Sequence, residues 1–237
     1  MLYLISLGIS EKDISLKGLE TAKSCSKIYL ENYTSVGCKT QDLQELIGKP
    51  IISADRTLVE SEKLIKESKK SDICLLIHGD ALSATTHLSL IQEAIKQNIP
   101  YKILHSSSIL TAVAETGLSL YKFGAVGSIS FQAIQENIKS PYHLLKNNDS
   151  IKLHTLFLLD LDPEKNKYLT IREAVSYLTR QGMDKNRLCI ACSRLGTPSQ
   201  KITASSADKL PDMSPPCCLI IPGELNFFEQ EFLENFK

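Results

Sequence analysis

The stretch Asp72–His87, DICLLIHGDALSATTH, carries the first indication of how this chain folds. It begins with the apolar run Ile73–Ile77, which is typical of a strand that is buried on both faces. Gly79 and Asp80 follow, and Ser and Thr residues then lead into a helical pattern. Gly and Asp favour turns, and Ser and Thr favour helix starts, so an ordinary turn explains the stretch. The alternative is a loop that binds a ligand beyond the end of a strand.

The composition is that of a globular protein. Apolar residues make up 43% of the 237 residues and charged residues 23%, which suits one large domain or two small ones. Lys plus Arg and Asp plus Glu balance at 27 each, so no polybasic field indicates nucleic acid or an anionic membrane. No apolar run approaches the roughly 20 residues of a membrane span. The opening MLYLISLG lacks the basic residues of a signal peptide, so we expect a cytoplasmic protein.

Short apolar runs alternate with helical patterns in the first half of the chain. The predicted strands are Leu2–Leu7, Lys27–Leu30, Ile51–Ser53, Ile73–Ile77 and Lys102–His105. The predicted helices are Leu16–Cys25, Gln41–Leu46, Val59–Lys69 and Leu88–Gln97, the third with a capping box of Thr57 and Glu60. This alternation predicts a parallel, Rossmann-like sheet with helices packed on it.

The second half has a different pattern. Ile109–Phe123 is predicted to form one long helix, with Gly117 a weak point inside it. The predicted strands are Val126–Phe131, Thr155–Leu161, Leu188–Ser193 and Cys218–Ile221. The predicted helices are Ile171–Thr179, opened by a Thr170–Glu173 capping box, and an amphipathic one in LNFFEQEFLENF, residues 225–236. We therefore predict an α/β protein of two domains, 1–115 and 116–237, with a mixed sheet in the second.

The seven cysteines do not suggest a disulfide framework, because their number is odd and they are scattered. Cys189 and Cys192, together with Cys217 and Cys218, supply four thiols, so a zinc site is the alternative. Both pairs lie in apolar runs without turn glycines, and their spacings point the paired side chains to opposite faces of a strand. We expect buried thiols and no metal.

No catalytic signature accompanies the Gly-Asp loop. The first loop, Leu7–Ser10, is LGIS instead of G-x-G-x-x-G, and Glu31 is the nearest acidic residue after the second strand. A nicotinamide enzyme is therefore disfavoured, and no P-loop is present. The five histidines, at 78, 87, 105, 143 and 154, show neither H-E-x-x-H spacing nor a nucleophile elbow, so most are interpreted as structural. This pattern favours a polar small molecule and a reaction driven by a cofactor.

The segment GDALSATTH (79–87) resembles the G-D-P-L-x-A-T-T-H motif of the diphthine synthase family, in the tetrapyrrole-methylase superfamily. Other segments resemble that family in the same order: DISLKGLE (13–20), ENYTS (31–35), HSSSILTAVAETGLSLYKFG (105–124), LHTLFLLDLDPEKNKYLTIREA (153–174) and PPCCLIIPGELNFFE (215–229). The likeness covers nearly the whole chain. It implies a two-domain tetrapyrrole-methylase-like fold with S-adenosylmethionine in the cleft between the domains, usually in a homodimer.

The resemblance also implies a reaction and a set of contacts. The family repeatedly methylates the amino group of a 3-amino-3-carboxypropyl-histidine in translation elongation factor 2, which gives diphthine during diphthamide biosynthesis. Carried over by position, the cofactor-binding residues would be Ile9, Asp80, Ser83, Ser108, Ile109, Leu159, Leu195 and Cys217. No catalytic residue is assigned, and neither the number of methyl transfers nor the formation of a methyl ester is decided.

Three departures from the family pattern stand out. Ala81 replaces the usual Pro, Cys217 stands where many relatives have His, and residues 131–150 are short and lack a Trp-containing stretch that bears on acceptor recognition. Two alternatives remain. A corrin or porphyrin methyltransferase would need a basic cluster for a polycarboxylate, which this sequence does not offer in an obvious form. A non-catalytic module that binds elongation factor 2 is the other.

Overall fold

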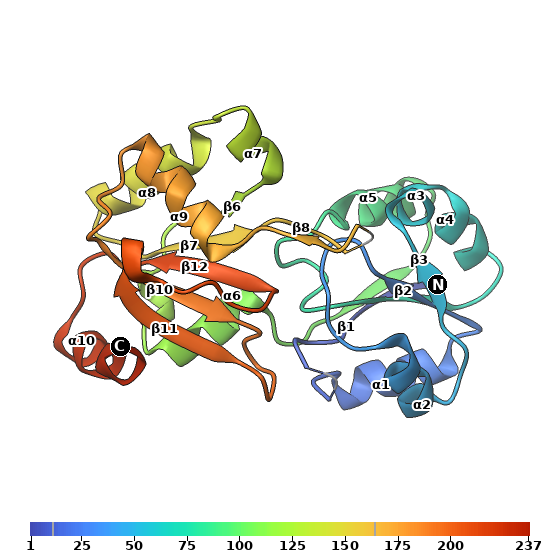
Figure 1. Cartoon of the computed structure of the whole chain (residues 1–237). Helices are drawn as coiled ribbons and strands as arrows, with labels where there is room; N and C mark the ends of the chain where they lie inside the picture. The colour runs from blue at the N-terminus through green and yellow to red at the C-terminus, as the bar shows by residue number, and fades with distance from the viewer. Residues whose placement is uncertain (11, 164) are drawn as a thin grey trace. The chain divides into compact units, whose positions relative to one another are not determined.

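Figure 1 shows the computed structural model of the chain, which describes residues 1–10, 12–163 and 165–237. The chain divides into two compact units, Met1–Leu110 and Thr111–Lys237. Within the described residues, none of the helices has the length and apolar character that are needed to cross a bilayer.

The first unit is built on a five-stranded, wholly parallel sheet with the order β3-β2-β4-β1-β5. The strands are β1 (Leu2–Ser6), β2 (Lys27–Glu31), β3 (Ile52–Ala54), β4 (Ile73–Ile77) and β5 (Tyr101–Leu104). Leu4 of β1 pairs with Leu75 of β4 on one side and with Ile103 of β5 on the other. Every residue of β4 is buried, as its uninterrupted apolar run predicts. The parallel sheet predicted from the sequence is confirmed.

Helices cover both faces of this sheet (Figure 1). The helices are α1 (Leu16–Ser24), α2 (Thr40–Ile47), α3 (Arg56–Glu60), α4 (Lys63–Ser68) and α5 (Leu88–Lys96). Because side chains alternate along a strand, β4 supplies both layers: Cys74 and Leu76 pack with α1 and α2, whereas Leu75 and its alternate neighbours pack with α3, α4 and α5. The core of the unit therefore lies on both sides of β4 and β1.

The helix predicted over Val59–Lys69 is instead two helices, α3 and α4. Asp55 is the N-cap of α3, because its carboxylate accepts a hydrogen bond from the Leu58 amide at 2.7 Å. The backbone becomes extended at Ser61, which ends α3. The Ser61 hydroxyl accepts a hydrogen bond from the Lys63 amide at 3.2 Å. The predicted Thr57–Glu60 capping box is therefore wrong, since a carboxylate two residues earlier already caps the helix.

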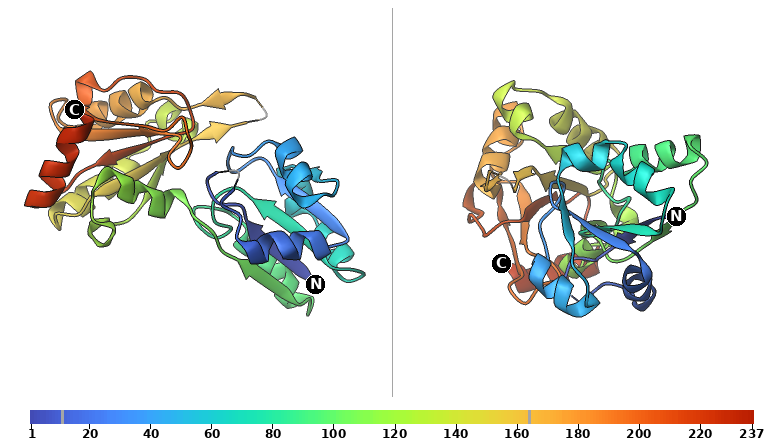
Figure 2. Two further views of the ribbon diagram at one scale, coloured as in Figure 1. Left: turned by 90° about the horizontal axis from the view of Figure 1, so that it is seen from below. Right: turned by 90° about the vertical axis from the view of Figure 1, so that its right-hand side faces the viewer.

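The second unit contains a mixed five-stranded sheet with the order β11-β10-β12-β7-β6. The strands are β6 (Gly127–Ile129), β7 (Thr155–Leu159), β10 (Leu188–Ser193), β11 (Lys201–Ser206) and β12 (Cys217–Ile221). β6 and β7 are parallel, and the other pairs are antiparallel. A short ribbon of β8 (Leu161–Asp162) and β9 (Lys167–Tyr168) projects beyond this sheet, as the left view of Figure 2 shows.

One face of the second sheet packs against α7 (Phe131–Gln135), α8 (Ser140–Ser150) and α9 (Ile171–Gln181) around Phe157 and Leu219. α9 begins at the predicted capping box: the Glu173 amide donates to Thr170 Oγ1 at 3.1 Å, and the Thr170 amide donates to Glu173 Oε2 at 2.8 Å. These hydrogen bonds satisfy backbone donors at the start of the helix that have no partner within it.

The prediction of one long helix over Ile109–Phe123 is wrong. The structure has one short turn of helix, α6 (Ile109–Ala112), followed by the 3-10 turns η1 (Val113–Thr116) and η2 (Leu120–Lys122). Gly117 separates the turns with a left-handed backbone, φ +82°. A Cβ atom on Gly117 would lie 2.2 Å from Cδ1 of Phe232, so this position needs glycine both for its backbone and for the close packing of the final helix.

The final helix, α10 (Phe227–Leu233), is held in the second unit by the buried carboxylate of Glu229. Lys122 Nζ donates to Oε2 of Glu229 at 2.5 Å and the Ser119 amide donates to Oε1 at 3.0 Å. His154 is also buried; its Nδ1 accepts from the Gly223 amide, so its Nε2 carries the hydrogen that faces Glu229 at 3.2 Å. Burial alone would raise the pKa of Glu229, but these hydrogen bonds lower it to about 2.

We predict that Glu229 makes the free energy of unfolding depend on pH in the acidic range. Its folded pKa lies below the unfolded value of about 4.3, so its contribution is present above pH 4.3 and is lost as the pH falls toward 2. A shift of roughly two pKa units corresponds to about 3 kcal/mol. Glu229→Gln should therefore lower the urea midpoint at pH 7, and the difference from wild type should shrink as the pH falls toward 2. Equal midpoints at pH 7 would contradict this role.

Candidate functional site

Five of the eight sequence-predicted contact residues lie at one edge of the first sheet. Ile9 follows β1, and Ser108 and Ile109 follow β5. Asp80 and Ser83 follow β4. The three strands are neighbours in the order β4-β1-β5 and all run parallel, so their carboxyl ends meet at the same edge. Ligands of open α/β sheets bind beyond this edge.

The other three predicted residues share an edge of the second sheet. Leu159 ends β7, Leu195 follows β10, and Cys217 begins β12. β12 runs antiparallel to both neighbours, so its first residue lies beside their last residues. Leu159 and Leu195 are buried, whereas Cys217 is half-buried. Burial raises the pKa of Cys217 to about 11, so its thiol is neutral at physiological pH.

Two glycines shape the edge of the first sheet. The backbones of Gly8 and Gly79 exchange hydrogen bonds of 3.0 and 2.8 Å, and both have a positive φ, +77° and +72°. A Cβ atom on Gly8 would lie 2.2 Å from Cβ of Asp13, whereas a Cβ atom on Gly79 would meet nothing within 4 Å. The backbone at Gly79 therefore borders open space, where a ligand can approach it closely.

The buried carboxylate of Asp80 joins the three strand ends. The groups that hydrogen-bond to it come from β1, from its own loop and from the end of β5: Ser6 Oγ at 3.5 Å, the Leu82 amide at 3.0 Å, Ser83 Oγ at 3.3 Å, His105 Nδ1 at 2.7 Å and the Ser106 amide at 3.3 Å. Burial on its own would raise the pKa of Asp80, but these donors lower it, so the carboxylate is ionised at neutral pH.

Hydrogen bonds from the protein itself fill the acceptor positions of Asp80. A carboxylate offers about four acceptor positions, and the protein itself supplies five donors. Asp80 therefore positions the loops that surround the open space at Gly79. Direct contact between Asp80 and a cofactor stays a prediction.

Ala81, which departs from the family's Pro, is accommodated by a hydrogen bond. Its amide donates to Oγ of Ser6 at 2.9 Å, and its side chain is fully buried. A proline has no N–H group and could not donate this bond. The loop thus lacks the fixed φ angle of proline but has a hydrogen bond to Ser6 at the end of β1.

Asp13 is a second organising carboxylate, and it was not singled out from the sequence. Its Oδ2 accepts from the amides of Ile9 and Ser10 at 3.2 and 3.0 Å and from Ser107 Oγ at 3.0 Å. Ser106 Oγ donates to the backbone carbonyl of Asp13 at 2.6 Å. Asp13 therefore ties the loop that carries Ile9 to the segment that precedes Ser108. Its only signal in the sequence was its place in the family-like segment DISLKGLE.

The pair formed by Asp80 and His105 was also missed. The sequence pattern favours a structural role for most histidines, yet the side chain of His105 is 64% exposed and its Nδ1 lies 2.7 Å from Asp80 Oδ2. The sequence places His105 at the end of one predicted strand and Asp80 after another but does not show that β1 alone separates β4 from β5. Knowledge of the strand order would have found the pair.

The remaining histidines of the first unit are buried beneath the surface. Burial lowers the pKa of both His78 and His87, which favours their neutral forms. His87 Nδ1 lies 3.3 Å from the carbonyl oxygen of Ala81, whereas Nδ1 of His78 has no hydrogen-bond partner among the described residues. Hydrogen bonding of the imidazole, expected for most of the histidines, is therefore found at both ring nitrogens of His154 and at Nδ1 of His87, whereas Nε2 of His87 and Nδ1 of His78 have no partner among the described residues.

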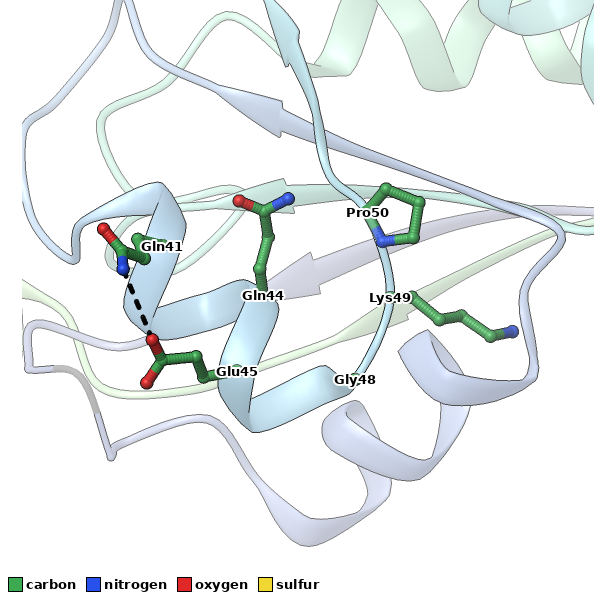
Figure 3. Close-up of a pocket in the computed structure, with 6 residues that line it drawn as sticks. All are labelled: Gln41, Gln44, Glu45, Gly48, Lys49 and Pro50. Carbon is green, nitrogen blue, oxygen red and sulfur yellow. Dashed lines mark hydrogen bonds between the residues drawn. The ribbon is translucent and has the colours of Figure 1, made fainter.

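A surface pocket elsewhere in the first unit is a poorer candidate. Figure 3 shows its lining residues, which are Gln41, Gln44, Glu45, Gly48, Lys49 and Pro50. α2 runs from the carboxyl end of β2 back to the start of β3, so Gly48 and Pro50 lie at the amino edge of the sheet. Lys49 Nζ is bound to the carbonyl oxygen of Cys25 at 2.9 Å. The pocket thus lies away from the strand ends where ligands of this fold class bind.

The chain matches the Tetrapyrrole (Corrin/Porphyrin) Methylases over residues 1–211. It therefore belongs to this family and is a methyltransferase.

Individual relatives place the chain more closely. The diphthine methyl ester synthases of Schizosaccharomyces pombe and Homo sapiens are 35% and 34% identical over all of this chain and cover 94% and 95% of their own length. The diphthine synthase of Methanococcus maripaludis is 36% identical over 99% of this chain and 98% of its own. A solved structure of a putative diphthine synthase from Entamoeba histolytica has a TM-score of 0.91 and 32% identity, covering 100% of this chain and 98% of that one. Within the methylase family, the chain is thus a member of the diphthine synthase group of diphthamide biosynthesis.

We predict that Asp80→Asn weakens the binding of S-adenosylhomocysteine roughly tenfold to a hundredfold. An amide can accept at only one of its two ends, so donors that now reach Oδ1 or Oδ2 would face an NH₂ group. Loss of a charge-assisted hydrogen bond inside the protein costs about 1.5–3 kcal/mol, and where ligand binding has to restore the order of the loops this cost appears as that loss of affinity. Calorimetry measures the affinity. Asp55→Asn is the matched control, because Asn caps a helix as well as Asp. Unchanged affinity in Asp80→Asn would indicate that the loop is an ordinary structural turn.

Proposed function

We propose that this protein transfers methyl groups from S-adenosylmethionine to the amino group of the 3-amino-3-carboxypropyl-histidine of translation elongation factor 2. The product is diphthine, and the reaction belongs to diphthamide biosynthesis. The observation that carries the proposal is the full-length similarity to diphthine synthases from eukaryotes and an archaeon. A cytoplasmic location follows from a substrate that works in translation.

The side chains of the predicted contact residues suit S-adenosylmethionine. In this proposal the cofactor contacts Ile9, Asp80, Ser83, Ser108 and Ile109 of the first unit and Leu159, Leu195 and Cys217 of the second. Apolar side chains such as Ile9 and Ile109 suit the adenine ring, whereas hydroxyl groups such as that of Ser83 suit polar parts of the molecule. The open space beside Gly79 supports the fit, because a bare backbone lets a ligand come close.

The chain contributes mainly alignment. S-adenosylmethionine supplies an electrophilic methyl group when it is bound, so the protein has to hold that group in line with the acceptor nitrogen. The hydrogen bonds around Asp80 and Asp13 already hold the loops in place, so little order has to be gained on binding. The acceptor amine must also lose a proton, because an amino-acid nitrogen with a pKa of about 8 is largely protonated at neutral pH.

Methylation of the acceptor's carboxylate is a second candidate activity of the same site. The relatives from Schizosaccharomyces pombe and Homo sapiens are named diphthine methyl ester synthases, whereas the relative from Methanococcus maripaludis is named diphthine synthase. The acceptor group carries an amine and a carboxylate on the same carbon atom. A site that presents one of them to the methyl donor therefore needs only a small movement of the acceptor to present the other.

We predict that the purified protein adds three methyl groups to elongation factor 2 that carries the 3-amino-3-carboxypropyl group. Intact-mass measurement resolves each addition, and a fourth one marks the methyl ester. The protein should bind S-adenosylhomocysteine in calorimetry and should not bind NAD, because the dinucleotide fingerprint is missing. Methylation of a corrin or porphyrin instead would favour the first alternative. Binding of elongation factor 2 without any change in its mass would favour a non-catalytic module.

We also propose that the protein is a homodimer. Phe227 and Phe228 of α10 are 72% and 77% exposed, and Tyr121 of the neighbouring turn η2 is 87% exposed. The hydrogen bonds from Ser119 and Lys122 to Glu229 hold this turn against α10, so the three exposed aromatic residues belong to two elements that are joined to each other. Exposed apolar surface of this kind is typical of protein interfaces, and two-fold dimers are the commonest soluble assembly.

This proposal predicts that Phe228→Glu converts a dimer into a monomer. A charge placed in an apolar interface would have to be buried without a partner, which is costly. Light scattering at micromolar concentration measures the mass of both proteins. Leu16→Glu is the matched control, because Leu16 is 73% exposed on α1 in the first unit. A monomeric wild type, or a Phe228→Glu variant that remains dimeric, would count against this interface.

A further inference from the structure

Asp80 and His105 form a carboxylate–imidazole pair in which the carboxylate is fixed and the imidazole is exposed. Nδ1 of His105 lies 2.7 Å from Oδ2 of Asp80, whose side chain is only 9% exposed. The Leu82 amide and Ser83 Oγ hold the other carboxylate oxygen at 3.0 and 3.3 Å. The side chain of His105 is 64% exposed. A rigid, buried anion therefore orients a ring whose other edge faces outward.

This arrangement selects one tautomer of His105. An ionised carboxylate can only accept hydrogen bonds, so Nδ1 of the imidazole carries the hydrogen that lies between them. In the neutral ring Nε2 then has a lone pair. No described residue forms a hydrogen bond with Nε2. The pair thus presents a base to whatever occupies the space at the strand ends.

The location of His105 matches the site that binds the methyl donor in the proposed function. It follows β5 directly and immediately precedes the segment Ser106–Ser108. Through Asp80 it is linked to Ser83, one of the predicted cofactor contacts. The base therefore lies at the same edge of the first sheet as the residues expected to hold the donor.

We propose that His105 is the general base that removes the proton from the acceptor amine, with Asp80 as the residue that positions it. This inference rests on the proposed function. The ammonium N–H bond breaks, and the proton moves to Nε2 of His105. The nitrogen lone pair then forms the new N–C bond while the S–C bond breaks, and its electron pair stays on sulfur. The exposed imidazolium returns its proton to water before the next transfer.

The proposal separates the two candidate methylations. Each of the three transfers to nitrogen requires one deprotonation, because every product short of the trimethylated one carries a proton at neutral pH. A carboxylate has a pKa of about 3.5 and is already ionised, so transfer to its oxygen needs no base. His105 is therefore required for the amine and not for the ester.

His105→Asn tests this role, because its amide nitrogen can replace Nδ1 as the donor to Asp80 while no base remains at Nε2. We expect amine methylation at pH 7 to slow by about a hundredfold or more. The deficit should shrink above pH 9, as the amine loses its proton unaided. Ester formation on an acceptor that is already trimethylated should keep its rate, and the affinity for S-adenosylhomocysteine should stay within about twofold, since the positioned loops are unchanged. His143→Asn, at an exposed histidine of α8, is the matched control.

The two carboxylates that hydrogen-bond to the segment His105–Ser107 keep their charge across this pH range. The carboxylates linked to the segment His105–Ser107 are Asp80 and Asp13. Hydrogen bonds lower the pKa of both, against the effect of burial, so both stay ionised from pH 6 to alkaline pH. A rate deficit that depends on pH in this range therefore reports the base and the amine.

A second measurement does not depend on activity. Long-range ¹H–¹⁵N NMR spectra of the histidine rings should show His105 as the Nδ1–H tautomer in the wild type, and Asp80→Asn should weaken this preference. An Nε2–H tautomer in the wild type would overturn the proposal. So would an unchanged rate in His105→Asn at pH 7, or a loss of rate that is equal at all pH values and accompanied by weaker S-adenosylhomocysteine binding. A wild type that methylates no amine would overturn the proposed function and this role with it.

Discussion

The hydrogen bonds that converge on the carboxylate of Asp80 hold together the part of the protein on which function depends. A parallel sheet leaves a separate loop at each strand end, and nothing in the ladder itself fixes these loops to one another. Asp80 joins the ends of β4, β1 and β5, and Asp13 joins the loops after β1 and β5 again. Ser106 connects the two centres, because its amide donates to Asp80 and its hydroxyl donates to the backbone of Asp13. The loops are therefore ordered before a ligand arrives, which reduces the entropic cost of binding.

The second unit uses similar chemistry for a different purpose. Glu229, like Asp80, is a buried carboxylate that accepts from backbone amides and lies beside a histidine. Its partner His154 is completely buried and is held on both ring nitrogens, so it has no group left for a substrate. The partner of Asp80, His105, is exposed and is held on one nitrogen. Solvent access to the second ring nitrogen thus distinguishes His105, a candidate base, from His154, which helps to anchor a helix.

The departures from the family pattern have little effect on this framework. The amide at Ala81 makes a hydrogen bond that proline could not make, so the loop keeps a connection to β1. The thiol of Cys217 is neutral and lies 3.4 Å from the carbonyl oxygen of Ser214. Residues 131–150 form α7 and α8, which pack on the second sheet and complete its core. These changes leave the strand-end geometry of the first unit intact.

The sequence alone determined the elements whose signals are local. The apolar run of β4, the capping box of α9 and the Gly-Asp loop all follow from neighbouring residues, and the family resemblance rests on the same continuous segments. The sequence did not show α8, because few of its residues are apolar, or β11, which lies at a sheet edge where polar residues are tolerated. It also predicted one helix across Gly117, where packing against Phe232 imposes a left-handed turn. Only the tertiary structure brought Asp80 to His105 and Asp13 to Ser107, because these pairs depend on the order of strands in the sheet. Strand order is set by long-range packing, which no short stretch of residues encodes.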